Sequence, residues 1–160
     1  MSGGDELIEL EQVSFRYAEM KTEALQNISL KVDKGKCVVL SGSSGCGKTT
    51  ITRLINGLIP GFYPGELSGT IKIDGEDISG REPHELATQV GSVFQNPRTQ
   101  FFNTDTDSEI VFGMENCGIS YEEMHYRYEQ TINNLNLESL CGRNIFALSG
   151  GEKQQIAFGS

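Results

Sequence analysis

The chain has 160 residues, about the size of one typical domain of ~150 residues and enough to bury a hydrophobic core. It holds 13 Lys and Arg against 22 Asp and Glu, a formal charge of −9. This balance argues against a nucleic-acid-binding protein, because such proteins usually carry net positive charge. No apolar run approaches the ~18 residues of a membrane span, and the acidic start lacks the apolar core of a signal peptide. We therefore expect a soluble, intracellular protein with no nucleic-acid partner.

Alternating apolar residues predict two strands near the start of the chain. The apolar residues keep one phase up to Leu10 and the other phase from Val13. This change at residues 11–12 predicts a β-bulge, because a one-residue shift turns every side chain to the other face. Residues 28–32 alternate as a second strand, and residues 33–36 (DKGK) predict a turn after it.

The next segment predicts a buried strand, a loop and a helix. Residues 37–40 (CVVL) form a continuous apolar run, which is typical of a strand buried on both faces. A glycine-rich segment follows, and then residues 49–56 predict a helix that Gly57 ends. Residues 58–69 are rich in Pro and Gly and predict a loop.

Further elements are predicted up to residue 146. A hairpin strand at 71–73 precedes the turn at 74–75 (DG), and a helix from Pro83 to Gln89 precedes a strand at 90–94. The region 106–146 is predicted to be helical. It contains two matches to the capping-box pattern, Thr106-x-x-Glu109 and Ser120-x-x-Glu123. After the second match, one helical face carries apolar residues that we expect to pack on neighbouring helices: Tyr121, Met124, Tyr128, Ile132 and Leu135.

Residues 42–49 match the phosphate-loop pattern GxxxxGK[ST], and they lie between a predicted strand and a predicted helix, as that pattern requires. Its glycines let successive backbone N–H groups point at phosphate oxygens, and the helix N-terminus adds a positive dipole end. Lys48 supplies a charge for the β and γ phosphates, and the Thr49 hydroxyl can ligate Mg²⁺. A chance glycine loop is disfavoured by the flanking elements. The predicted nucleotide-binding residues in this region are Gly42, Ser43, Ser44, Gly45, Cys46, Gly47, Lys48, Thr49 and Thr50.

A second glycine-rich motif, LSGGEKQQ, spans residues 148–155. Ser149-x-x-Glu152 is a capping box, so the motif by itself is compatible with an ordinary helix start. Gly150 and Gly151 leave bare amides at that positive helix end, which can serve as a second phosphate-binding surface. The pairing with the phosphate loop favours this second interpretation.

The two motifs together resemble the Walker A loop and the signature motif of the ATP-binding subunits of ABC transporters. The resemblance covers nearly the whole chain. It implies catalytic roles for Lys48 and Gln95, the latter as the Q-loop glutamine, and Mg²⁺ ligation through Thr49 and Gln95. It also places Tyr17 where the family has an aromatic residue stacked on adenine. Because Tyr17 shares the phase of Val13 and Phe15, core packing remains an equal alternative for it.

Three segments resemble the narrower energy-coupling-factor group, which imports vitamins and transition-metal ions: 56–60 (NGLIP), 65–69 (GELSG) and 94–102 (FQNPRTQFF). Two positions depart from the usual pattern. Arg98 stands where that group usually has an acidic residue, and Gln155 stands where the family usually has Arg.

The resemblance implies an α/β fold of the ABC ATPase type, with an antiparallel β subdomain, a parallel core and a helical subdomain. We expect the β subdomain and core over residues 1–97, the helical subdomain over 98–148, and the signature motif with the start of its helix over 148–160. The Walker B carboxylates and the switch histidine should lie beyond Ser160. The sequence is therefore expected to be the N-terminal part of a longer ATPase domain.

The implied protein binds ATP with Mg²⁺ and hydrolyses it to drive a membrane importer of a small solute, a vitamin or metal ion. Two ATPase domains close head to tail, so that ATP on one phosphate loop meets Ser149 and Gly151 of the other. The implied partners are this second domain, a transmembrane transporter subunit and a substrate-binding membrane subunit. The implied location is the cytoplasmic face of the cell membrane.

Three alternatives compete with transport. A soluble ABC-type ATPase of DNA repair would carry a long coiled coil between Gln95 and Ser149, and no sustained heptads occupy that stretch. A phosphate-loop kinase or GTPase would lack the signature motif. The third alternative applies to the 160 residues alone, which are expected to bind nucleotide without turning it over because they lack the family's hydrolytic carboxylates.

Overall fold

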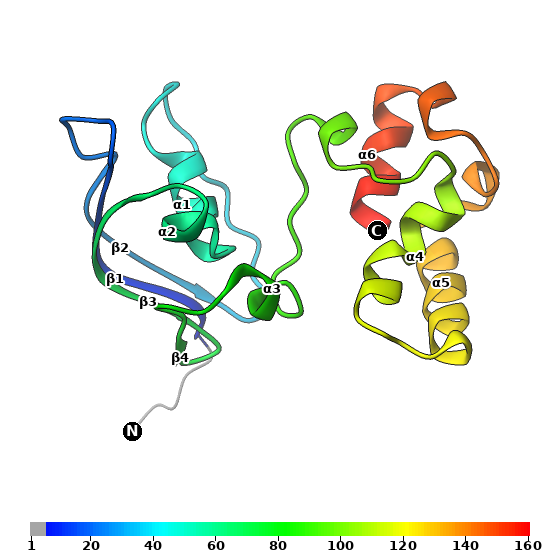
Figure 1. Cartoon of the computed structure of the whole chain (residues 1–160), viewed down its shortest axis with the longest axis horizontal. Helices are drawn as coiled ribbons and strands as arrows, with labels where there is room; N and C mark the ends of the chain where they lie inside the picture. Colours follow the sequence, from blue (N-terminus) through cyan, green and yellow to red (C-terminus); the bar gives the residue numbers. More distant parts are fainter. Residues whose placement is uncertain (1–5) are drawn as a thin grey trace. The chain divides into compact units, whose positions relative to one another are not determined.

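The computed structural model describes residues 6–160; the first five residues, which begin the predicted domain, lie outside the described residues. The chain forms two compact units, one ending at Ser92 and the other spanning Val93–Ser160. The first unit contains a β-sheet with short helices, and the second unit is helical (Figure 1). Each unit is built around a hydrophobic cluster of its own.

Four antiparallel strands form the sheet of the first unit, in the order β2-β1-β3-β4. Their bounds are Glu6–Tyr17 for β1, Leu25–Asp33 for β2, Gly65–Ile73 for β3 and Glu76–Asp77 for β4. The predicted bulge is confirmed, because the register of β1 shifts between Leu10 and Val13 against β2, and Gln12 has a φ of 49°. The predicted turn after β3 is also confirmed, with positive φ at both Asp74 and Gly75, as a tight hairpin requires.

The bulge explains why apolar residues before and after it, which alternate in opposite phase, all point into the core. Leu10 is 1% exposed, and Val13 and Phe15 are fully buried. Figure 1 shows α1 (Lys48–Ile55) and α2 (Leu58–Gly61) on one face of the sheet, where Leu54 and Ile59 join the same cluster. The short helix α3 spans Pro83–Leu86 and adds Leu86 to it. The expected loop at 58–69 is therefore partly wrong, since it contains α2 and the first half of β3.

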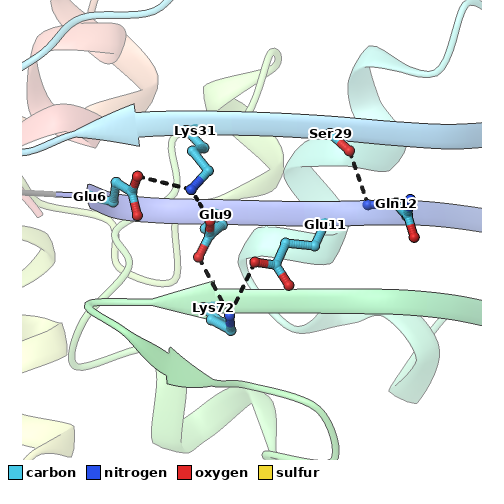
Figure 2. Close-up of polar contacts among 7 residues, drawn as sticks. All are labelled: Glu6, Glu9, Glu11, Gln12, Ser29, Lys31 and Lys72. Atoms are coloured by element: carbon cyan, nitrogen blue, oxygen red, sulfur yellow. Dashed lines mark hydrogen bonds and ion pairs between the residues drawn. The ribbon is translucent and has the colours of Figure 1, made fainter. Parts of the chain in front are cut away.

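A ladder of alternating charges crosses the three long strands (Figure 2). Glu9 of β1 lies directly opposite Lys31 of β2 and Lys72 of β3, and it forms ion pairs with both. Glu6 and Glu11 flank this centre, pairing with Lys31 at 2.9 Å and with Lys72 at 3.3 Å. The hydrogen bond between Glu9 and Lys31 lowers the pKa of the carboxyl group and raises the pKa of the ammonium group. Opposite charges in register thus favour the observed strand pairing.

The strands expected at residues 37–40 and 90–94 are not formed. Val39 is 82% exposed and Phe94 is 45% exposed, so neither run is buried on both faces. An apolar run becomes a buried strand only where neighbouring strands satisfy its backbone and other layers cover its faces. Within residues 6–160 every strand pair is antiparallel, and the expected parallel core is absent from this part of the chain.

Three longer helices form the second unit: α4 (Thr106–Asn116), α5 (Tyr121–Leu135) and α6 (Gly150–Gly159). Short 3₁₀ turns lie at Pro97–Thr99, Glu138–Leu140 and Ile145–Ala147. The core of this unit consists of Ile110, Ile132, Leu137, Leu140, Leu148 and Ile156. The expected stripe on α5 contributes Ile132 to this core, with Tyr128 and Leu135 packed against it, whereas Tyr121 is 76% exposed.

The capping box expected at the start of α4 is wrong. Asp105 caps the helix instead, accepting the amide of Ser108 at 2.9 Å. Thr106 is fully buried and donates to the carbonyl of Leu140, while Glu109 accepts the backbone amides of residues 102 and 103. Tertiary hydrogen bonds have thus replaced the local ones. The predicted cap of α5 is confirmed, because Ser120 Oγ accepts the amide of Glu123.

Candidate nucleotide-binding site

The predicted phosphate loop leads directly into α1, and its glycines adopt conformations that other residues rarely reach. Gly42, Gly45 and Gly47 have φ angles of 152°, 82° and 91°. Gly47 is the N-cap of α1, and a Cβ there would lie 2.8 Å from the carbonyl oxygen of Ala24 and 2.7 Å from Leu25 Cδ2. Both backbone angle and close approach therefore require glycine at this position.

Lys48 is the first residue of α1, and its ammonium group turns back into the loop. Nζ donates to the carbonyl oxygens of Gly42 at 3.0 Å and Ser43 at 2.8 Å, and it lies 3.5 Å from Cys46 Sγ. A cation beside a helix N-terminus has no electrostatic benefit from the helix dipole, whereas an anion has one. The loop is thus a positively polarised concavity suited to phosphate oxygens.

Tyr17 and the phosphate loop line one cavity of about 300 Å³. Its wall consists of Tyr17, Met20, Thr22, Glu23, Ala24, Gly45, Gly47, Lys48, Thr49 and Thr50. Tyr17 is partly buried, and its ring makes an edge-on contact with Phe15 at a centroid distance of 4.8 Å. Its hydroxyl lies 3.1 Å from Thr50 Oγ1. Tyr17 therefore packs against the core residue Phe15 and also lines the cavity, so the two expected roles do not exclude each other.

Thr49 fits a magnesium ligand. It is an exposed hydroxyl residue on the first turn of α1 and lines the same cavity as Lys48. Mg²⁺ in nucleotide sites takes only one or two protein oxygens and completes its shell with phosphate oxygens and water. Gln95, the other expected ligand, is exposed and belongs to the second unit.

The signature motif lies in the second unit, at the start of α6. The predicted capping box is confirmed, because the Ser149 amide donates to Glu152 Oε2 at 2.6 Å and the Glu152 amide donates to Ser149 Oγ at 3.3 Å. Arg143 forms an ion pair with the other carboxylate oxygen at 2.9 Å. The bonds from Ser149, and next the bond from Arg143, lower the pKa of Glu152 to about 2.

This helix start leaves hydrogen-bond donors free for a ligand. Ser149 Oγ accepts a bond from the Glu152 amide, and the Ser149 side chain also hydrogen-bonds the Glu152 carboxylate. Gly150 and Gly151 are exposed in the first turn of α6, where amides have no partner within the helix. Lys153 is 4% exposed and ties the motif down by donating to the carbonyl of Leu148 at 2.7 Å.

Sequence reasoning missed two arginines beside the predicted residues. Arg53 donates to the Tyr17 hydroxyl, and Arg143 pairs with Glu152. Arg53 lies three positions after Thr50, so helical spacing predicts that these two share a face of α1. Neither the link from Arg53 to Tyr17 nor that from Arg143 to Glu152 has a local spacing signal.

A glycine loop that leads into a helix, a lysine at that helix N-terminus and a second glycine-rich helix start are features of the phosphate-loop nucleoside triphosphatase fold. The sequence profile of the family described as ABC transporter matches residues 25–160, and the chain belongs to this family. Its fold is that of an ABC ATPase, because it superposes on the structure of cbiO1 from Clostridium perfringens with a TM-score of 0.85. That structure is described as part of the ABC transporter complex cbiONQ. It is 26% identical, and the match covers 98% of this chain and 61% of that one.

Two curated relatives extend the comparison. A protein of Treponema denticola, named as an ABC transporter ATP-binding protein, is 55% identical over 96% of this chain and 32% of its own length. The energy-coupling factor transporter ATP-binding protein EcfA1 of Ligilactobacillus salivarius is 36% identical over 94% of this chain and 52% of its own length. The chain thus spans about a third to a half of these relatives. Among residues 6–160, no helix combines the length and hydrophobicity needed to cross a bilayer.

Proposed function

We propose that the chain supplies the nucleotide-binding part of an ATP-hydrolysing subunit that energises a membrane importer of a small solute. The observation that carries the proposal is the position of the Lys48 ammonium group, inside the phosphate loop and in the same cavity as Tyr17. A triphosphate in the loop exchanges the two carbonyl contacts of Lys48 for phosphate oxygens. The adenine base then lies at the end of the cavity that Tyr17 lines.

Thr49 holds the magnesium ion of the bound nucleotide in this proposal. When bound, Mg²⁺ neutralises charge on the β and γ phosphates. Gln95 links the γ-phosphate to the helical unit, and it shares the metal with Thr49. These roles follow from the positions that match the family motifs.

The signature motif acts on nucleotide held by a second ATPase domain. The amides of Gly150 and Gly151, beside the Ser149 hydroxyl, form a donor set for phosphate oxygens, with Glu152 maintaining the helix start. Two such domains close head to tail and reopen after hydrolysis. The remaining partners are a transmembrane subunit and a substrate-binding membrane subunit, which place this chain on the cytoplasmic face of the membrane.

We further assign the importer to the energy-coupling-factor type, with a vitamin or a metal ion as solute. Support comes from the three sequence segments that resemble this group and from the names of relatives. These include EcfA1 and an HMP/thiamine import ATP-binding protein of Bacillus subtilis that is 39% identical over 98% of this chain. For the 160 residues alone, the proposal is nucleotide binding without turnover, because no apolar run in the sequence ends in the paired carboxylates of a Walker B strand.

Calorimetric titration of the 160-residue chain with Mg-ATP tests the proposal. We expect measurable binding that Lys48→Ala weakens by about tenfold or more, since one charge-assisted contact to phosphate is lost. Lys36→Ala is the matched control, because Lys36 is an exposed lysine outside the loop. Equal ATP affinity in the Lys48 variant and the wild type would overturn the proposed site. Phosphate release should stay at background in both.

A further inference from the structure

The phenol oxygen of Tyr17 is held from one side by two residues of α1. Arg53 Nη1 donates to it at 3.1 Å, and Thr50 Oγ1 lies at 3.1 Å. Thr50 and Arg53 are three positions apart, so they lie on the same face of the helix. Tyr17 is the last residue of β1, where the strand gives way to a turn. These contacts restrict the ring at the end remote from its backbone.

Arg53 is itself fixed by a second aromatic residue, Tyr63. Its guanidinium carbon lies 3.9 Å from the centroid of the Tyr63 ring, a cation–π arrangement. The Tyr63 ring meets the Tyr17 ring edge-on at 6.4 Å. Arg53 is thus packed over one ring while it hydrogen-bonds the other, which leaves it little freedom to move.

We infer that Arg53 is a positioning residue for the nucleotide base, which sets the orientation of the Tyr17 ring on the cavity wall. The inference rests on the proposed function, in which the base lies against Tyr17. The helix α1 then spans both ends of the ligand. Its first turn carries Lys48 and Thr49, which contact the phosphates. Its second turn carries Arg53, which holds the Tyr17 ring against which the base lies.

A purely structural role for Arg53 predicts a different result. If Arg53 only joined β1 to α1, its loss would disturb the phosphate loop and the base end alike. If Arg53 positions Tyr17, its replacement should lower the affinity only for ligands that carry a base. Inorganic tripolyphosphate has the phosphates of ATP without the base, so the ratio of the two affinities separates the roles.

The experiment measures dissociation constants of Mg-ATP and Mg-tripolyphosphate for the 160-residue chain by calorimetry. For Arg53→Met we expect ATP to bind about threefold to tenfold more weakly, a fraction of the full contribution of a base stacked on an aromatic ring. Tripolyphosphate affinity should stay within about twofold, because Lys48 and the loop amides are untouched. Tyr17→Phe keeps the ring and removes the oxygen. It should likewise weaken ATP binding and leave tripolyphosphate binding nearly unchanged.

Two controls make the result decisive. The Arg53→Met/Tyr17→Phe double variant should lose no more ATP affinity than either single variant, because both changes break the same hydrogen bond between Arg53 and Tyr17. Arg81→Met removes another arginine of the first unit, one paired with Glu76, and should alter neither affinity. An equal loss of both ligands in Arg53→Met, or no loss of either, would overturn the inference. A wild-type chain that binds no tripolyphosphate would instead overturn the proposed function.

Discussion

Arg143 and Glu152 form an ion pair at 2.9 Å that ties the segment before the signature motif to the first turn of its helix. The carboxylate is shared, since its second oxygen accepts the amide of Ser149. Arg143 therefore acts on the signature serine through Glu152. The pair also joins α6 to the loop after α5, which no local sequence pattern predicts.

Replacing Arg143 by Met should raise the pKa of Glu152 from about 2 towards its ordinary value near 4.5, because one of the groups that favour the charged form is removed. A carboxyl group with a lowered folded-state pKa stabilises the fold above its unfolded pKa, and this contribution is lost as pH falls through the folded value. In the wild type the loss falls between pH 4.5 and about 2; in the variant it should still begin near pH 4.5 but be complete at a higher pH, with a smaller total loss.

A carbon-detected NMR titration of the Glu152 carboxyl group measures this directly. Arg127→Met serves as the control, because Arg127 pairs with Glu123 on the surface of α5 and does not contact Glu152. An unchanged Glu152 midpoint in Arg143→Met would show that the helix-start amides alone set the pKa.

Two glycines of the phosphate loop should respond differently to alanine. Both have positive φ, but a Cβ at Gly45 meets nothing within 4 Å, whereas a Cβ at Gly47 lies 2.8 Å from a backbone oxygen. Gly45→Ala should cost about 1–2 kcal/mol of backbone strain. Gly47→Ala should cost about 1–3 kcal/mol more from overpacking, and it should weaken Mg-ATP binding. Denaturant melts of the two variants, with ATP titrations, provide the comparison. Equal costs would mean that α1 shifts freely away from Ala24.

Alkylation of Cys46 should block nucleotide binding, and bound nucleotide should protect Cys46. The thiol is exposed and lies 3.5 Å from Lys48 Nζ, within the loop that would cradle the phosphates. Cys37, which is also exposed but lies before the loop, is the internal reference for general reactivity. Peptide mass spectrometry after timed labelling gives both rates. Saturating Mg-ATP should slow labelling of Cys46 alone; an equal effect of ATP on both thiols would place Cys46 outside the site.

Local patterns predicted those features that depend on a few adjacent residues. The bulge at 11–12, the turn at Asp74 and the cap at Ser149 follow from phase, positive φ and capping chemistry, which act within one turn or one pleat. The strand at 37–40 was wrong because an apolar run specifies burial only when other layers supply it. The contacts from Arg53 to Tyr17 and from Arg143 to Glu152 join residues that only the folded chain brings together. The motifs thus located the predicted site, and tertiary structure supplied its supporting residues.

Thr106 also makes contacts that local sequence does not predict, and their effect can be tested. Its hydroxyl donates to the Leu140 carbonyl at 2.8 Å and accepts the Arg143 amide at 3.2 Å, so it joins the start of α4 to the segment that precedes the signature motif. Thr106→Val keeps the shape and removes both bonds. It should destabilise the second unit by about 1–3 kcal/mol, because both hydroxyl hydrogen bonds between the two segments are lost. Thr106→Ser keeps the hydroxyl and serves as the control.

Native-state hydrogen exchange locates the effect of Thr106→Val, since it reports opening free energies amide by amide. We expect lower protection in α4 and in the segment around Arg143, with protection in β1 unchanged, because β1 belongs to the other unit. Thr106→Ser should retain most of the wild-type protection. If Thr106 acted only as a local cap of α4, the amide of Arg143 would keep its wild-type protection in the valine variant. Loss of protection at Arg143 in Thr106→Val, but not in Thr106→Ser, is therefore the result that identifies the hydroxyl as the link to the signature segment.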